Sequence, residues 1–171
     1  MDESNNPVDV TAALVMQSTD IPWDCVPRAT CIGEITVARA IDERLVAEDT
    51  VLTNNGFVFG VQYGYERDGG LAAQHGVLLF PDPTAAANAW SEMLPFNRDR
   101  WSARTLSGIG DSALLLEGEV TRQLLWRHSD VVSVLMMCGA DRVDLEPVAW
   151  TLDQRIKQYA AARSRQPVAA S

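Results

Sequence analysis

The stretch from Phe57 to Phe80 places the strongest constraint on the fold of this chain. From Phe57 to Tyr65, large apolar side chains alternate with valine, glycine and glutamine, which is the period of a strand that buries one face. Arg67-Asp68-Gly69-Gly70 follows, and Asp-Gly supplies the positive backbone angles that a tight turn requires. The sequence therefore predicts a β-hairpin at this point.

Pairing straight across the turn predicts which side chains share a face. The aromatic face of the first strand should also carry these residues of the second: Ala72, Gln74, Gly76, Leu78 and Phe80. His75 is then expected beside Gln62 on the opposite face. Gly76 would leave room for a neighbouring ring, and we expect any opening near the turn.

Length and composition predict one folded domain. The chain has 171 residues, of which 47% are apolar, enough for a sizeable core. We expect residues 9–163 to form this domain, with flexible tails at residues 1–8 and 164–171. The net charge of −9 repels phosphate backbones, so nucleic acid is not an expected partner.

The cellular compartment stays open at the level of the residues. No apolar run reaches the roughly 20 residues that a membrane-spanning helix needs, and the acidic opening MDESNNPVDV does not fit a signal peptide. The protein is then either cytoplasmic or a mature or excised domain. Cys25 and Cys31 are close enough in sequence for a local disulfide, although Cys138 could pair with either, and in the cytoplasm all three would be small apolar residues.

The remaining segments predict helices and further strands. Residues 34–48 are read as a helix, although Ile35 and Val37 alternate as in a strand. Pro81-Asp82-Pro83-Thr84 should start a second helix that Pro95 ends, and Asp144 should cap a third. Extended segments are expected between these two later helices, at residues 101–106, 112–116, 121–127 and 131–138.

This order of elements predicts an α+β fold. Strands joined by short turns are antiparallel, because a parallel pair needs a long crossover connection. We expect a single domain with a central antiparallel sheet of five or six strands and two main helices packed on one face.

Catalytic and metal-binding patterns are missing from the sequence. The two histidines, His75 and His128, do not have metal-ligand spacing, and no G-x-S-x-G elbow is present. Cys138 has apolar neighbours, which raise a thiol pKa and favour a structural role. No metal or other cofactor is expected, and a non-enzymatic role is favoured.

Aromatic residues are the candidates for a binding site. The chain has five tryptophans and three tyrosines, and buried Trp and Tyr often lie at ligand-binding surfaces because one end of each is polar. The sequence predicts that ligand contacts come from Tyr63, Tyr65, His75, Trp101 and Trp126. Core packing is the competing interpretation of each.

Several short phrases resemble those of a known family. They are Asp20-Ile21-Pro22, the hairpin followed by Pro-Thr-Ala-Ala-Ala, Gly108-Ile109-Gly110-Asp111, and Trp126-Arg127 before Val131-Val132-Ser133-Val134. Over most of residues 20–163 they resemble actinobacterial lipoproteins and the extracellular sensor domains of mycobacterial receptor kinases. The resemblance implies a sheet backed by helices, a cleft for an unidentified ligand, disulfides and no known catalytic residues.

The chain also departs from this family. The sensor domains commonly carry two disulfides, whereas three cysteines allow one, which the resemblance assigns to Cys25 and Cys31. The lipid-attachment cysteine is absent.

Together these patterns predict a non-enzymatic, extracytoplasmic binding or sensor-type domain with an aromatic-lined cleft for an apolar ligand or a partner protein. Two alternatives stay open. One is an assembly subunit that docks on a larger complex, and the other is a small enzyme with a carboxylate or His75 as general base. The oligomeric state is not predicted.

Overall fold

An antiparallel sheet organises the fold, as the computed structural model shows for residues 13–99, 101–139 and 144–163. The predicted tails, residues 1–8 and 164–171, lie outside the described residues. The strands are β1 (Val26–Pro27), β2 (Gly33–Glu34), β3 (Phe59–Arg67), β4 (Gly70–Leu79), β5 (Ser102–Leu106), β6 (Ser112–Glu117), β7 (Thr121–His128) and β8 (Val131–Cys138). Their order is β1-β3-β4-β8-β7-β6-β5, and β2 pairs with β3.

The predicted α+β class is confirmed. The sheet has eight strands where the sequence predicted five or six, and the additional ones are the two-residue β1 and β2. Such short strands carry no alternation that a sequence pattern could reveal.

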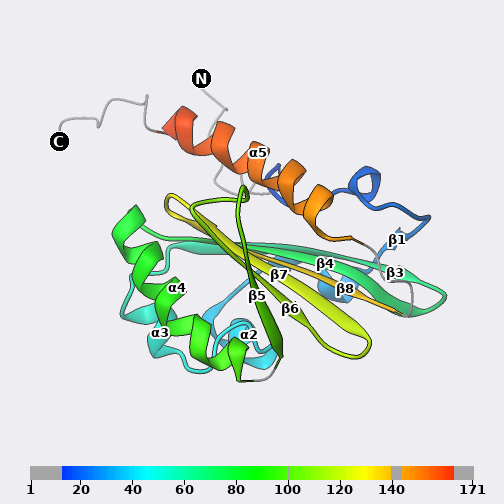
Figure 1. Ribbon diagram of the computed structural model, residues 1–171, viewed down its shortest axis with the longest axis horizontal. Coiled ribbons are helices and arrows are strands. Elements are labelled where there is room, and N and C mark those ends of the chain that lie inside the picture. Colours follow the sequence, from blue (N-terminus) through cyan, green and yellow to red (C-terminus); the bar gives the residue numbers. More distant parts are fainter. Residues whose placement is uncertain (1–12, 100, 140–143, 164–171) are drawn as a thin grey trace.

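The helices lie on both faces of the sheet, so the expectation of one helical face was wrong (Figure 1). They are α2 (Val37–Asp42), α3 (Thr50–Thr53), α4 (Pro83–Arg98) and α5 (Glu146–Arg163), with short 3-10 turns at Ser18–Asp20 and Ala29–Cys31. Leu115 packs in the core under α5, whereas Leu114 and Leu116 pack in the core under α4. Consecutive apolar residues in a strand point to opposite faces, and a strand like β6 therefore needs cover on both sides.

The long helices begin where the sequence predicted. The Asp82 carboxylate accepts hydrogen bonds from the backbone N–H groups of Thr84 and Ala85, at 2.8 and 2.9 Å. Asp144 caps α5 in the same way through the N–H of Glu146, at 3.1 Å. Pro95 does not end α4, which continues to Arg98. The φ of proline, near about −65°, is a helical angle, although the ring removes one N–H donor and crowds the preceding turn. The helix predicted at residues 34–48 is limited to α2.

One extra residue sets the register of the hairpin. The turn is as predicted, with positive φ angles of 53° at Asp68 and 78° at Gly69. A β-bulge follows, since Glu66 pairs with Leu71 but Tyr65 pairs with Ala73, leaving Ala72 as the extra residue. A shift of one residue moves all later side chains of β4 to the other face.

The predicted faces of β4 were therefore wrong. Tyr63 pairs with His75, and both lie on the face covered by α5. Gln62 pairs with Gly76 on the other face, beside Gln74, so His75 is not next to Gln62.

Gly76 accommodates a side chain from an incoming loop, not the aromatic ring that the sequence predicted there. A Cβ atom at Gly76 would lie 3.2 Å from Cδ1 of Ile35, and one at Gly60 would lie 2.9 Å from Cβ of Ile35. A Cβ atom at Gly64 would overlap the Cβ of Cys31. The segment that leads into α2 therefore packs directly on the strand backbones.

Cys25 and Cys31 are not bridged, which corrects the predicted disulfide; both are free thiols, as is Cys138. Cys25 packs against the core on the α5 face, while Cys31 lies over Gly64 on the face that carries Ile35. The chain crosses the sheet edge between them, and six residues of sequence separation could not indicate this.

The close packing at Gly64 can be tested by substitution. We expect Gly64→Ala to lower the free energy of unfolding by about 1–3 kcal/mol, because the new methyl group must displace Cys31 or the strand. Gly70→Ala is the matched control, since its nearest neighbour would be a backbone oxygen 3.8 Å away. Urea unfolding of both variants measures the effect, and equal stabilities would contradict the packing described.

Candidate functional site

The five predicted ligand-binding residues do not form one cleft. Tyr63, Tyr65, His75 and Trp126 belong to the α5 face, where Tyr65, His75 and Trp126 are buried. Trp101 packs against the core on the α4 face. Their role in binding stays a prediction.

His75 is held in the core by a specific set of contacts. The backbone N–H of Met16 donates to its Nδ1 at 3.0 Å, so the neutral ring carries its proton on Nε2. The ring stacks on Trp126 with centroids 5.4 Å apart and an interplanar angle of 8°. Burial lowers the pKa of His75 to about 3, with Asp20 acting to raise it and Arg155 to lower it further. His75 is therefore neutral at physiological pH.

The same backbone segment binds Tyr65. The Tyr65 hydroxyl donates to the Met16 carbonyl at 3.0 Å, and burial raises the pKa of this phenol. Asp20 forms a bidentate ion pair with Arg155 of α5, with N–O distances of 2.6 and 2.8 Å. These contacts anchor the segment before β1 under α5, and they account structurally for two of the predicted site residues.

A pocket of about 340 Å³ opens beside the hairpin turn. The sequence predicted that any opening would lie at this end of the hairpin. We call it the hairpin pocket. It is lined by Trp23, Arg67, Asp68, Gly70, Leu71, Ala72, Cys138 and Gly139, none of them among the five predicted ligand-binding residues.

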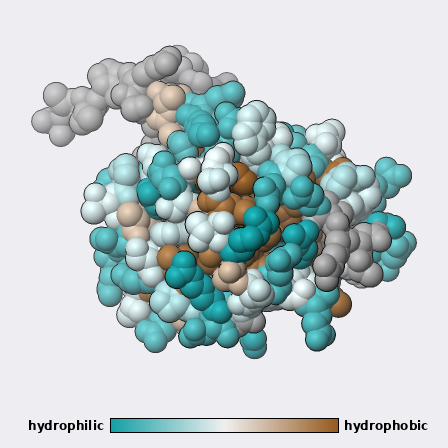
Figure 2. All heavy atoms as spheres, viewed as in Figure 1, coloured by the Kyte–Doolittle hydropathy of each residue, from teal (hydrophilic) through white to brown (hydrophobic). Residues whose placement is uncertain are grey.

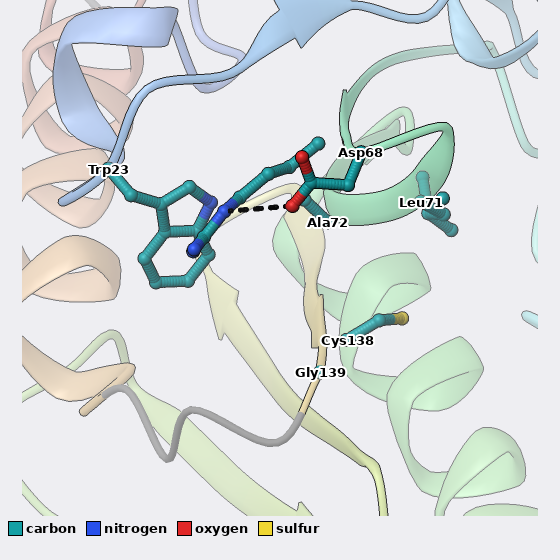
Figure 3. Close-up of a pocket in the computed structure, with 8 residues that line it drawn as sticks. Trp23, Asp68, Leu71, Ala72, Cys138 and Gly139 are labelled. Carbon is teal, nitrogen blue, oxygen red and sulfur yellow. Dashed lines mark ion pairs between the residues drawn. The ribbon is translucent and has the colours of Figure 1, made fainter.

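The walls of the hairpin pocket differ in character. Figure 3 shows the Trp23 ring on one side and Leu71 and Cys138 on the other. The indole N–H of Trp23 is buried and has no hydrogen-bond partner among the described residues. Arg67 and Asp68 form an exposed ion pair at 3.6 Å on the turn. The pocket thus combines an aromatic ring, aliphatic surface and a charged rim.

The Cys138 thiol is not set up as a nucleophile. Burial raises its pKa, and a hydrogen bond from Thr121 offsets only part of that. A thiol with a raised pKa is protonated at neutral pH and reacts slowly. Across the described residues, no group of three His, Cys, Asp or Glu side chains is placed to hold a metal ion.

Sequence reasoning missed Trp23 and Arg67 for identifiable reasons. Trp23 lies in an irregular segment between Pro22 and β1, where no periodicity shows which way a side chain points. Arg67 fits the turn sequence Arg67-Asp68-Gly69-Gly70, which carries no further signal of a pocket. A tryptophan beside a proline, outside any regular element, was the available signal.

The fold has a counterpart among solved structures. It is similar to the crystal structure of the extracellular domain of PknH from Mycobacterium tuberculosis, with a TM-score of 0.50 and 13% sequence identity. The likeness covers 90% of this chain and 96% of that domain. No family model and no curated protein matches the chain. At this identity the likeness establishes the fold.

We expect the free energy of unfolding to decrease as the pH is lowered, because of His75. The unfolded histidine, with a pKa of about 6.5, takes up a proton that the folded one, with a pKa of about 3, does not. Between these values the unfolded state binds more protons, so stability is lost as the pH falls, by up to about 1.4 kcal/mol per pH unit. Urea unfolding from about pH 7 to about pH 4.5 measures the slope.

Two variants isolate the contribution of His75. His75→Asn keeps an acceptor for the Met16 N–H and should flatten the pH dependence of the unfolding free energy. Tyr65→Phe removes the neighbouring bond to Met16 but no group that titrates in this range, and it should keep the slope. A wild-type slope in His75→Asn would show that other groups cause the dependence.

Proposed function

We propose that this chain is a non-enzymatic binding domain of the sensor type, displayed outside the cytoplasm, that takes a small apolar ligand into the hairpin pocket. The observation that carries the proposal is the pocket itself, in which Trp23 faces aliphatic surface and a protonated thiol. An aromatic ring and aliphatic side chains bury apolar ligand surface, which is the main source of affinity in such sites.

The buried N–H of Trp23 supports a particular kind of ligand. An unpartnered donor in a buried position costs free energy, which a ligand acceptor would recover. A molecule with an apolar body and one carbonyl or hydroxyl oxygen meets this requirement.

The location outside the cytoplasm is supported by the fold. The similar domain of PknH is extracellular. Among the helices described here, none combines the length and the apolar character needed to span a bilayer. The three free thiols do not distinguish a location outside the cytoplasm from one inside it, because an unbridged cysteine can occur in both.

One observation favours docking on another protein as a second candidate function. β5 is an edge strand, and four of its five side chains are exposed. Figure 2 shows apolar residues among hydrophilic ones on the face where Figure 1 places β5 and β6. Unpaired strand edges are templates for pairing with another chain. Light scattering that shows a stable oligomer at micromolar concentration would favour this second function over a monomeric ligand-binding domain.

Tryptophan fluorescence tests the ligand-binding proposal. We expect palmitate, lysophosphatidylcholine or N-phenylnaphthylamine to change the emission in a saturable way, and Trp23→Phe to weaken the binding about tenfold, or by about 1.4 kcal/mol. Trp150→Phe is the matched control, because Trp150 is 55% exposed on α5 and lines neither pocket described here.

Alkylation provides a second readout in the same protein. A ligand in the hairpin pocket should slow maleimide modification of Cys138 more than that of Cys25 or Cys31, as measured by peptide mass mapping. Absence of both a fluorescence change and Cys138 protection with all three probes would contradict an apolar ligand in this pocket.

A further inference from the structure

A second pocket, of about 190 Å³, lies on the α4 face of the sheet and shares no lining residue with the hairpin pocket. We call it the amide pocket, because three glutamines from three strands line it: Gln62 of β3, Gln74 of β4 and Gln123 of β7. Val134 and Met136 of β8 complete the floor, and Glu43 and Leu45 approach from the segment after α2.

Strand pairing sets these side chains in rows. Met136 lies between Gln74 and Gln123, its direct partners on the two neighbouring strands. Gln62 lies one row further along, opposite Gly76. The rest of this face is an apolar core, so three carboxamides in adjacent rows interrupt it.

Hydrogen bonds fix part of this arrangement. The Glu43 carboxylate accepts from Arg39 Nε at 2.7 Å, from Gln62 Nε2 at 2.9 Å and from Gln74 Nε2 at 2.8 Å. Gln74 Nε2 also donates to Gln62 Oε1 at 3.1 Å. Glu43, the one carboxylate among the described residues that line the pocket, is therefore neutralised by Arg39 and occupied by amide donors.

The groups left for a ligand carry no charge. Gln74 Oε1 and Gln123 Oε1 have no hydrogen-bond partner among the described residues. Gln123 Nε2 donates only to the weak acceptor Met136 Sδ, at 3.5 Å. Two free acceptors and a weakly used donor thus stand beside the apolar surface of Leu45, Val134 and Met136.

This combination points to a class of ligand. A charged ligand would find no opposite charge that is free to pair, and it would lose its hydration. A purely apolar ligand would leave the carboxamides unpaired. A ring with hydroxyl groups on its edge and C–H groups on its face matches both parts of the lining. The volume corresponds to about six water molecules at liquid density, which is the scale of one sugar ring.

We propose that the amide pocket binds a neutral pyranose sugar, with Gln74 and Gln123 accepting hydrogen bonds from its hydroxyl groups and Val134 and Met136 contacting its C–H face. The sugar is either a free monosaccharide or the terminal unit of a glycan. This site is independent of the ligand proposed for the hairpin pocket.

The test follows the glutamine side-chain amides in nitrogen–proton NMR spectra of the full chain. Glucose, galactose, mannose and N-acetylglucosamine are titrated to about 50 mM, which covers millimolar affinities. We expect at least one to shift the Gln123 and Gln74 resonances saturably. Glucuronate and glucosamine should bind at least about tenfold more weakly, because each adds a charge. A methyl glycoside that binds as well as the free sugar identifies the end of a glycan as the source, and loss of binding identifies the free sugar.

Substitutions separate binding from structure. Gln123→Leu should weaken binding about tenfold without disturbing the hydrogen bonds to Glu43, in which Gln123 takes no part. Gln123→Glu keeps the shape and should shift the preference towards glucosamine. Gln158→Leu, at an exposed position on α5, is the matched control. Absence of shifts with every neutral sugar, equal binding of the charged sugars, or wild-type affinity in Gln123→Leu would overturn the proposal.

Discussion

One extra residue, Ala72, determines what each face of the sheet presents. Strand side chains alternate, so a single bulge between the turn and the rest of β4 sends His75 to one face and Gln74 to the other. His75 then stacks on Trp126 under α5, while Gln74 joins Gln62 and Glu43 on the α4 face. Ala72 itself lines the hairpin pocket. Both pockets and the buried histidine thus depend on the same local irregularity.

Polar groups position the segment before β1 within the apolar core under α5. His75 and Tyr65 both bind the backbone of Met16, and Asp20 pairs with Arg155 of α5. A buried polar group costs free energy unless it is paired, and these partners fit only when the segment before β1 lies in one position. His75 and Tyr65, which the sequence predicted as ligand contacts, thus hold the segment before β1 in place.

At each of the two pockets, one side chain among the described residues that could react is held in an unreactive state. The Cys138 thiol at the hairpin pocket is protonated, and the Glu43 carboxylate at the amide pocket is neutralised by its neighbours. Apolar surface and neutral hydrogen-bonding groups at these two pockets match the ligands proposed for them. The likeness to the PknH extracellular domain, at 13% identity, concerns the fold, and the lining residues of this chain supply the functional inference.

The sequence by itself determined the α+β class, the hairpin turn at Asp68-Gly69 and the helix starts at Asp82 and Asp144, because turn angles, caps and periodicity are local properties. Only the tertiary structure decided the faces of β4, the separation of Cys25 from Cys31 and the pocket residue Trp23. A bulge changes register without changing composition, and a loop that crosses a sheet edge is set by contacts with distant strands. The turn end of the hairpin was thus predictable as the place of an opening, whereas the residues that line it were not.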